Sequence, residues 1–369
     1  MAKAPTITRR QLNRATLARQ MLLGRERTAV LPAIERLAGM QAQLARPPFL
    51  GLWSRVEGFR REDLTELLHR REVVRATMMR CTLHLVSARD YLAFRPALQP
   101  VMTRAMTSIL RQRAADLDVV RVAAAARDYL AGEPRTFEEI REHLVASGVP
   151  GEERAMGYTV RTQLPLVQVP DGSDWAFPSA AAFTLAETWL GRPVSDDARG
   201  PGALVKAYLG AFGPASPADA QTWSGLQGLR EVFEGLRPEL CTFRDERGRE
   251  LFDLPGAPRP AEDVPAPPRF LPDFDNLVLA HDDRSRLIAD EHRPLVSKPN
   301  LVVLPTFLVD GIVSGTWSIA KAKGTATLVM EPFAPIPKGA RAELMEEGQR
   351  LVRFVEPRAK GHDVQLGKP

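Results

Sequence analysis

The sequence contains very little cysteine. Cys81 and Cys241 are the only two in 369 residues, and they lie far apart, without the spacing of metal ligands. This pattern excludes a disulfide framework and a zinc-finger motif, and it is typical of a protein from a reducing compartment. We expect both thiols to behave as buried, small hydrophobic side chains and not as catalytic groups.

Long hydrophobic runs are also absent. No stretch approaches the ~20 apolar residues that a membrane helix requires, and the basic residues 1–10 are not followed by the apolar core of a signal peptide. With 44% hydrophobic and 26% charged residues, the composition is that of a globular protein, and the length predicts two or three domains. We expect a cytoplasmic protein without a membrane partner. Since nothing in the sequence requires a dimer, we also expect a monomer.

Lysine is rare, so arginine carries most of the positive charge, and this charge is unevenly distributed. Residues 1–113 hold 21 Lys+Arg against 8 Asp+Glu, a net charge of +13. The remainder therefore holds 29 against 37, a net charge of −8, within the overall +5. A basic segment joined to an acidic remainder is typical of a surface that binds a polyanion. The alternative is that these arginines only solvate helix faces.

The basic segment is predicted to contain helices followed by strands. Apolar residues recur on one helical face over 9–23, and further helices are predicted over 29–40 and 63–69. Residues 75–86 are rich in strand-forming side chains and predict one or two strands. This order is typical of a winged helix, in which strands form a wing beside a DNA-contacting helix.

The middle of the chain is predicted to repeat this order twice. Helices over 136–147 and 152–162 precede a hairpin over 167–177 that turns at Asp171-Gly172. Helices between 204 and 236 precede a strand over 239–243. No repeat is visible residue by residue, so the prediction of tandem winged helices depends on the order of elements alone.

The last third has a different texture. Residues 255–270 are rich in proline and predict a linker. Short strands and tight turns then alternate between 301 and 330, which predicts a small β-barrel or a curled sheet, and a helix over 340–354 precedes a basic tail. We therefore predict an α+β, mostly helical fold in which tandem winged-helix motifs pack with a C-terminal β-barrel. The predicted units are three winged helices over 1–113, 114–197 and 198–256, and the barrel with its closing helix over 257–369.

An unusual segment, Gly39 to Pro48, lies inside the basic region. It places Gln41 and Gln43 on either side of one apolar residue, followed by Arg46 and the helix-ending pair Pro47-Pro48. A glutamine amide is neither acid nor base at neutral pH, but it orients water or a cationic centre. Residues i and i+2 share a face only in extended chain, so both glutamines serve one site only if the chain leaves the helix near Met40. Alternatively, the pair caps a helix end or bridges to another domain.

Several short motifs recur in a fixed order over residues 8–356. They are Gln41-Ala-Gln43, Leu52–Arg55, Arg80–Val86, Gly213-Pro214, Trp223–Leu226, Leu271–Asp275, Gly315–Trp317 and Pro332-Phe333. Each is weak alone, but together they resemble the bacterial winged-helix DNA-binding-domain family that contains the AlkZ and YcaQ DNA glycosylases. Gln41-Ala42-Gln43 matches the Gln-apolar-Gln signature of the AlkZ-like branch. The chain lacks the Asp that ends this motif in the YcaQ-like branch.

The resemblance implies a monofunctional DNA glycosylase that hydrolyses the N-glycosidic bond of alkylated purines and unhooks interstrand crosslinks. Its partner is double-stranded DNA containing such purines, so the protein is expected at the nucleoid, and no cofactor or metal is needed. A purine alkylated at N7 is already cationic, so it leaves without an enzymic acid. What remains is to stabilise the sugar cation and to position water. We expect Gln41 and Gln43 to do this.

Basic and polar side chains near the motif are candidates for DNA contacts. Arg80, Thr82 and His84 fall on alternate positions of a predicted strand, so we expect them to share one face. There they either contact DNA or pack on another domain. A cluster at Asp275, His281, Asp282 and Asp283 lacks metal-ligand spacing, so no metal site is predicted. The candidate DNA contacts are Arg9, Arg10, Arg14, Arg46, Arg80, Thr82 and His84.

Two other functions remain open from the residues themselves. One is a winged-helix DNA-binding protein without catalysis, a regulator or a lesion sensor. The other is a self-resistance protein that sequesters a reactive metabolite, for which a large apolar pocket without a basic rim would argue.

Overall fold

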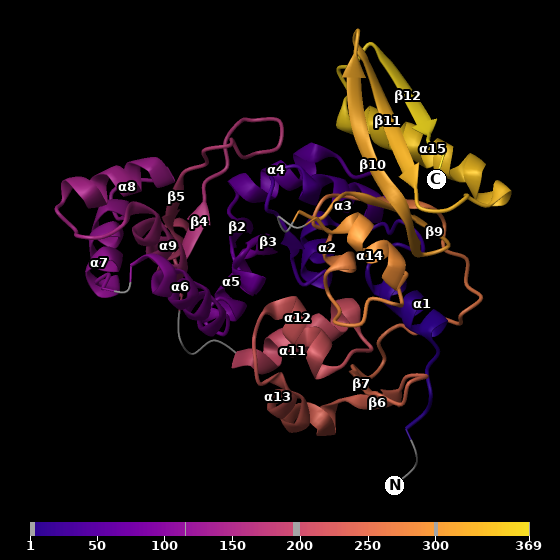
Figure 1. Cartoon of the computed structure of the whole chain (residues 1–369), viewed down its shortest axis with the longest axis horizontal. Helices are drawn as coiled ribbons and strands as arrows, with labels where there is room; N and C mark the ends of the chain where they lie inside the picture. Colours follow the sequence, from indigo (N-terminus) through magenta and orange to yellow (C-terminus); the bar gives the residue numbers. More distant parts are fainter. Residues whose placement is uncertain (1–3, 115, 195–199, 299–301, 369) are drawn as a thin grey trace.

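The computed structural model describes residues 4–114, 116–194, 200–298 and 302–368 and shows an α+β fold (Figure 1). None of its helices combines the length and apolar character that crossing a membrane would require, within these described residues. The first helix, α1 (Arg9–Arg19), begins at the capping box formed by Thr8 and Gln11 and is shorter than the predicted 9–23.

The first unit alternates helices with short strands. β1 is antiparallel to β3, which is antiparallel to β2, so β3 lies in the middle of these three strands. In this register Gln41 of β1 lies opposite His84 of β3. The predicted strand region 75–86 is therefore two strands with a turn between them. The elements are α2 (Val30–Arg36), β1 (Met40–Gln41), α3 (Pro47–Arg55), α4 (Arg61–His69), β2 (Val73–Thr77) and β3 (Leu83–Ser87).

The prediction that Pro47-Pro48 ends a helix is wrong. The two prolines are the first residues of α3. The first positions of a helix need no backbone N–H donor and favour the fixed φ of proline, so a proline pair begins a helix as readily as it ends one. The segment from 42 to 46 is consequently a short connection between a strand and a helix.

The second unit continues the same sheet. β4 pairs with β2, so the strand order is β1-β3-β2-β4-β5 and the sheet runs across the predicted boundary at 113/114. Arg135 forms an isolated bridge with Phe183 of β5. α5 (Ala88–Phe94) and α6 (Gln99–Arg113) follow β3 and connect the first unit to the second. The elements of the second unit are α7 (Val119–Leu130), α8 (Phe137–Ala146), α9 (Glu153–Gln163), β4 (Leu166–Gln168), β5 (Phe183–Leu185) and α10 (Ala186–Leu190).

The hairpin predicted over 167–177 is wrong in its second strand. β4 ends at Gln168 and pairs with β5 across a loop of residues 169–182. Pro170 has no N–H to donate to the ladder. The Asp171-Gly172 signal makes a local turn inside the loop, where the Asp171 amide donates to the carbonyl of Ala176 at 2.8 Å.

The third unit packs beside α1. Ala215 bridges Phe252 in β7, and β6 and β7 form a separate hairpin. The elements are α11 (Gly200–Phe212), α12 (Pro217–Ser224), α13 (Leu229–Leu236), β6 (Cys241–Arg244) and β7 (Glu250–Asp253). All three units thus share one order of elements. A helix comes first, followed by a short segment that pairs with the last strand of the unit. Two more helices and a pair of antiparallel strands complete it.

The C-terminal part is an open sheet, so the predicted closed β-barrel is wrong. Its strand order is β12-β11-β10-β9-β8, and the edge strands β8 and β12 do not pair among the described residues. α15 supplies the reason, because its buried Leu344, Leu351 and Val352 pack against the sheet and cover the apolar face that closure would otherwise bury. The elements are β8 (Arg269–Leu271), β9 (Thr306–Val309), β10 (Ile312–Ala322), β11 (Thr325–Pro332), α15 (Lys338–Val355) and β12 (Gly361–Leu366).

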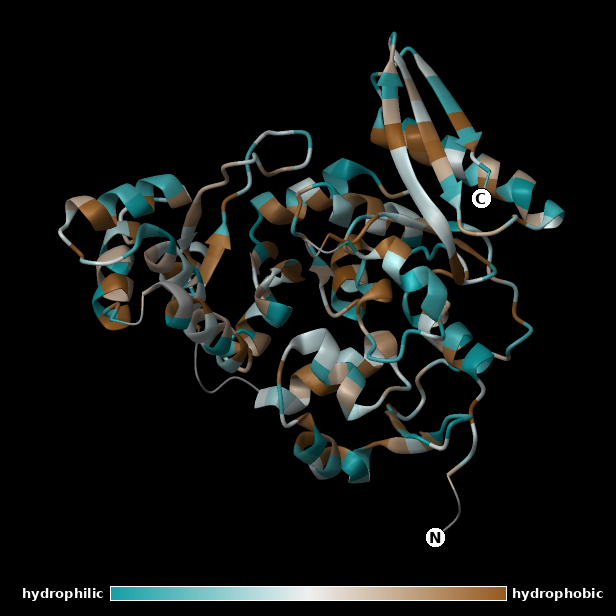
Figure 2. Cartoon of the chain, in the orientation of Figure 1, coloured by the Kyte–Doolittle hydropathy of each residue, from teal (hydrophilic) through white to brown (hydrophobic). Residues whose placement is uncertain are grey.

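Two further predictions for this part differ from the structure. In the predicted strand 301–304, Leu301 lies outside the described residues and Val303 makes only an isolated bridge with Ser297. The predicted basic tail forms β12, which runs parallel to β11. The β10–β11 hairpin projects from the molecule, and its far end is hydrophilic (Figures 1 and 2).

Much of the positive charge of residues 1–113 is paired inside the protein. Arg14 and Arg10 both bind Asp310, and the buried Arg19 forms a two-pronged pair with Asp253 at 2.7 and 2.8 Å. Arg25 binds Glu347 and Arg46 binds Asp273, again across more than two hundred residues. Several of the N-terminal arginines therefore form ion pairs with the acidic remainder of the chain. The net charge of residues 1–113 consequently overstates the positive charge that is free to bind DNA.

A second buried link of this kind joins α3 to the segment before β9. Both Nη atoms of Arg55 donate to the carboxylate of Asp275 at 2.9 Å, and their side chains are only 2% and 4% exposed. Asp275 also accepts from the Leu277 amide and so begins the 3₁₀ turn η3 (Asn276–Val278). This pair fixes Asn276 relative to α3.

Replacing Arg55 with methionine should lower the free energy of unfolding by about 3–5 kcal/mol, because the buried Asp275 carboxylate would lose its partner. Chemical denaturation measures the difference. Arg27→Met is the matched control, since Arg27 pairs with Glu57 at the surface and such pairs contribute little. Equal losses in the two variants would contradict a special role for the buried pair.

Candidate functional site

Gln41 leaves the helix as the sequence required. α2 ends at Arg36, and Ala38 and Gly39 then adopt positive φ values of 52° and 87° before β1 begins. Gly39 is needed here, since a Cβ at this position would lie 2.5 Å from the Cγ1 of Val86. The chain is thus extended at Met40 and Gln41, and β1 ends at Gln41.

The amide of Gln41 is fixed by an arginine. Nη2 of Arg80 donates to the Gln41 Oε1 at 2.6 Å and to the Asn276 Oδ1 at 3.1 Å. Nη1 of Arg80 donates to the carbonyl of Trp223. Asn276 in turn donates to the carbonyl of Gly39 at 3.3 Å. Because a guanidinium only donates, the oxygen of Gln41 must face Arg80, and its NH₂ group is left free to donate elsewhere.

The expectation that Arg80, Thr82 and His84 share one strand face is wrong for Arg80. Arg80 lies in the 3₁₀ turn η1 (Met79–Cys81) with φ 55°, and Cys81 also has a positive φ of 58°. Thr82 closes this turn by donating to the carbonyl of Met79. The left-handed turn directs Arg80 into the protein toward Gln41. Burial, with the nearby Arg284, lowers the pKa of Arg80 to about 10, so it stays charged at neutral pH.

His84 is buried and neutral. Its Nδ1 lies 3.0 Å from the carbonyl of Thr82, so Nδ1 carries the proton, and no described residue binds its Nε2. Burial, with the charge of Arg80, lowers the pKa of His84 to about 3. At neutral pH it therefore has no second proton to give, and its side chain is inaccessible to DNA.

Gln43 lies in a different environment from Gln41. It is exposed, and its Oε1 accepts a long hydrogen bond of 3.4 Å from the amide of Leu83. It lines a groove of about 610 Å³ between the first two units, together with Arg75, Arg161 and Phe177. A water or a sugar can displace such a weak bond, so the Gln43 oxygen is available for chemistry.

Gln41 instead lines a narrow cavity of about 10 Å³. Its polar neighbours there include Asp275, Asn276 and Gln20. This volume holds about one water molecule, and the polar lining offers that water the partners it needs. The two glutamines therefore face separate cavities, joined only by the short segment between them.

The other predicted DNA contacts are divided by their surroundings. Arg14 is buried and binds Asp310 and the carbonyl of Val264, so its guanidinium is committed to the protein and cannot reach a phosphate. Arg10 is half-exposed but also binds Asp310. Arg9 is exposed, and Arg46 is 35% exposed with a single long pair to Asp273 at 3.3 Å. Of these, Arg9 and Arg46 are accessible and are not held by a short ion pair with any described residue.

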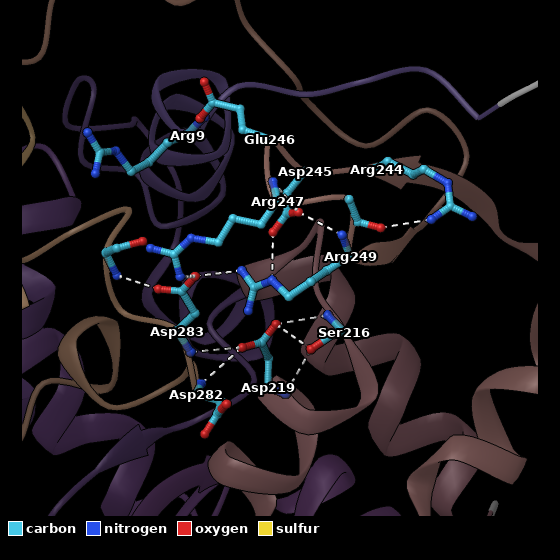
Figure 3. A network of polar contacts seen from close by, with 12 residues as sticks. Arg9, Ser216, Asp219, Arg244, Asp245, Glu246, Arg247, Arg249, Asp282 and Asp283 are labelled. Atoms are coloured by element: carbon cyan, nitrogen blue, oxygen red, sulfur yellow. Dashed lines mark hydrogen bonds and ion pairs between the residues drawn. The ribbon is translucent and has the colours of Figure 1, made fainter.

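The acidic cluster noted in the sequence has structural partners. Asp275 binds Arg55, and His281 lies 3.0 Å from the carbonyl of Phe212. Asp283 binds Arg249 and Arg247, in the polar network of Figure 3. Within the parts of the chain that the structure describes, no group of three or more His, Cys, Asp or Glu side chains could hold a metal ion.

Three residues near the glutamines were not singled out from the sequence. Asn276 fixes Arg80, while Arg75 donates from Nε to the carbonyl of Ala42 at 2.9 Å and from Nη2 to that of Gln43 at 3.2 Å. Gln168 faces the same groove as Gln43. The one feature of the sequence that could have indicated Arg75 is its position in the predicted strand region 75–86, five residues before Arg80. Nothing local marks Asn276 or Gln168.

Comparison with known proteins gives a consistent result. A family model described as DNA glycosylase AlkZ-like matches residues 34–354. An interstrand DNA cross-link repair glycosylase from Streptomyces sahachiroi is 28% identical over 350 residues, covering 88% of this chain and 90% of that protein. The solved structure of the Streptomyces sahachiroi DNA glycosylase AlkZ matches with a TM-score of 0.75 over 98% of this chain and all of that one, at 21% identity. At that identity the structural match concerns the fold.

The buried His84 should make the protein sensitive to acid. Its pKa is about 3 when folded and ordinarily 6.5, so between these values the unfolded chain binds a proton that the folded protein does not. Stability should thus fall as pH falls below 6.5, by at most about 1.4 kcal/mol per pH unit from this residue. Urea denaturation of wild type and His84→Gln at pH 7 and pH 5 tests this. A stability difference between the two proteins that does not change with pH would contradict it.

Proposed function

The chain belongs to the AlkZ-like family of DNA glycosylases, and on this premise we propose that it hydrolyses the N-glycosidic bond of cationic N7-alkylpurines and unhooks interstrand crosslinks. The observation that carries the proposal is the Gln-apolar-Gln motif at the end of β1, with Gln41 held by Arg80 and Gln43 exposed at a groove. The cross-link repair glycosylase of Streptomyces sahachiroi, similar along nearly the whole chain, supports the crosslink substrate. The site of action would be the DNA of the nucleoid.

The chemistry suits side chains that neither gain nor lose a proton. An N7-alkylpurine carries a positive charge that becomes neutral when the base leaves, so no acid is required. The transition state needs a dipole facing the sugar cation and a positioned water. Neutral His84 and the carboxylates tied up in ion pairs fit this absence of acid catalysis near the motif.

The two glutamines would have different roles in the reaction. The oxygen of Gln43 is the accessible dipole, so it would face the sugar cation or hold the attacking water. Gln41 has its oxygen engaged by Arg80, so it acts through its NH₂ group, beside a cavity with room for one water. Neutral lesions should be poor substrates, since nothing here protonates the base.

We further propose that the three units are winged helices. In the first unit the order α2, β1, α3, α4, β2, β3 is that of a winged helix, and β3 lies between β1 and β2. The second and third units repeat it, with the bridges at Arg135 and Ala215 in the place of β1. Arg46 and Arg9 are the proposed phosphate contacts, because they are accessible and, unlike Arg10, are not held by a short ion pair within the described part of the chain.

The alternatives receive less support. A regulator or lesion sensor without catalysis would have no use for an exposed glutamine dipole at this motif, and the family is one of glycosylases. A protein that sequesters a metabolite would favour an apolar pocket without basic residues. The groove beside Gln43 instead carries Arg75 and Arg161.

Replacing either glutamine should abolish most of the activity. We expect Gln43→Ala to slow release of N7-methylguanine from methylated duplex DNA by about 10²–10³-fold, the usual cost of removing one transition-state dipole. Gln41→Ala should slow it by at least about tenfold through lost positioning. Affinity for the undamaged duplex should not change. Release that persists in the double variant would place the chemistry elsewhere.

Arg80 should act through Gln41. Arg80→Met would free the Gln41 amide to rotate, so we expect kcat to fall about tenfold with unchanged KM and duplex affinity. In a Gln41→Ala background the same change should have almost no further effect, because the side chain that Arg80 positions is already gone. Steady-state kinetics of the four proteins measure this coupling.

Arg104→Met is the matched control for Arg80. Arg104 is an exposed arginine that donates to the carbonyl of Gly225, two residues from the Trp223 carbonyl that Arg80 binds. It should leave kcat unchanged. A loss of duplex affinity in Arg80→Met at constant kcat would instead make Arg80 a phosphate contact.

A further inference from the structure

The groove beside Gln43 is assembled from distant parts of the chain. Gln43 and Leu44 form one wall, and the N-terminus of α8 with Phe137 forms another. Arg75 of β2 and Gln168 of β4 are direct cross-strand partners, so both side chains project from the same face of the sheet into the groove. Leu44 is 49% exposed, which is unusual for a large apolar side chain in a surface loop.

The side-chain oxygen of Gln168 has no hydrogen-bond donor among the described residues. The residue is only 7% exposed, and this Oε1 atom is itself buried. Buried polar atoms are normally satisfied, so an orphaned acceptor in a groove indicates a missing donor. No internal contact explains why a glutamine stands here.

Arg75 supplies the complementary group. Its Nε and Nη2 donate to main-chain carbonyls, but none of the described residues accepts a bond from Nη1. Its guanidinium carbon lies 5.0 Å from the ring centroid of Phe177, a cation–π contact with one wall of the groove. A free donor and a free acceptor thus stand side by side on the floor of a groove with aromatic walls.

We infer that this groove binds a single purine turned out of the DNA stack, with its donor–acceptor edge on Arg75 and Gln168 and its ring between Phe177 and Leu44. Guanine alkylated at N7 presents O6 as acceptor and N1–H as donor on one edge, which matches Arg75 Nη1 and Gln168 Oε1. The assignment to a lesion rests on the proposed function, because it is Gln43 at the groove that would act on the attached sugar. The floor is polar but uncharged at Gln168, so it accepts the neutral base that the reaction leaves.

The inference separates two classes of substrate. A base alkylated on one strand only is free to leave the stack and enter the groove. A base crosslinked to both strands cannot, so a crosslink must be attacked while it remains in the duplex. Gln168 therefore determines specificity for monoadducts and has no part in unhooking.

The first test requires no catalysis. Wild type and Gln168→Leu are titrated with a duplex carrying one unpaired guanine and with the fully paired duplex, and binding is followed by fluorescence anisotropy of an end-labelled strand. We expect wild type to prefer the unpaired purine by about tenfold, the worth of one or two buried hydrogen bonds, and the variant to lose that preference. Equal preference in both proteins, or none in wild type, overturns the inference.

The second test compares substrates. Gln168→Leu should slow release of N7-methylguanine by about tenfold and leave crosslink unhooking unchanged, whereas equal loss on both substrates overturns the assignment to monoadducts. If wild type released no base at all, the proposed glycosylase activity would be wrong. The preference for an unpaired purine would still show whether the groove binds a base. Replacing an unsatisfied acceptor with an apolar group should not lower the melting temperature. Gln349→Leu, which removes the hydrogen bond from Gln349 on α15 to the His362 carbonyl on β12, is the control for an unrelated glutamine loss.

Discussion

The candidate site depends on one buried ion pair, between Arg55 and Asp275. Asp275 begins the 3₁₀ turn that presents Asn276, Asn276 binds Arg80, and Arg80 binds the oxygen of Gln41. The turn at Asp275 is a local contact, whereas the other links are charged hydrogen bonds between segments that are separate in the sequence. A shift of the segment around 275 would therefore move the Arg80 guanidinium and release the Gln41 amide. Burial strengthens this series of contacts, since little water competes for them.

The arginines of the N-terminal segment have two separate roles: some form buried ion pairs, and others stay accessible at the surface. Arg14, Arg19 and Arg55 are almost fully buried and hold α1 and α3 against the acidic C-terminal half. An ion pair of this kind orients segments more than it stabilises them, because removing both charges from water is costly. The charge that remains for DNA is carried by fewer, accessible groups such as Arg46.

Separation of the two glutamines is the main chemical consequence of the fold. The left-handed residues before β1 extend the chain at Gln41, but the strand ends there, so Gln43 turns toward the groove between the first two units. One amide is held beside a small cavity with room for one water molecule, and the other is exposed at the groove. This arrangement suits a reaction in which the leaving base is already charged and only the sugar and the water need to be positioned.

Local sequence indicated several helices, such as α1, α4 and α9, and the exit of the chain before Gln41, but the helices α3, α5, α6 and α7 were not predicted. The capping box of Thr136 and Glu139 correctly predicted the start of α8, and the glutamine motif with the ordered segments around it indicated the family. Tertiary structure alone decided that Pro47-Pro48 begins a helix, that the last sheet stays open under α15, and that Arg80 turns inward. It also decided the partners of Arg55 and Asn276. Propensities and caps act over a few neighbouring residues, whereas these partners are brought together only when segments about two hundred residues apart pack against each other.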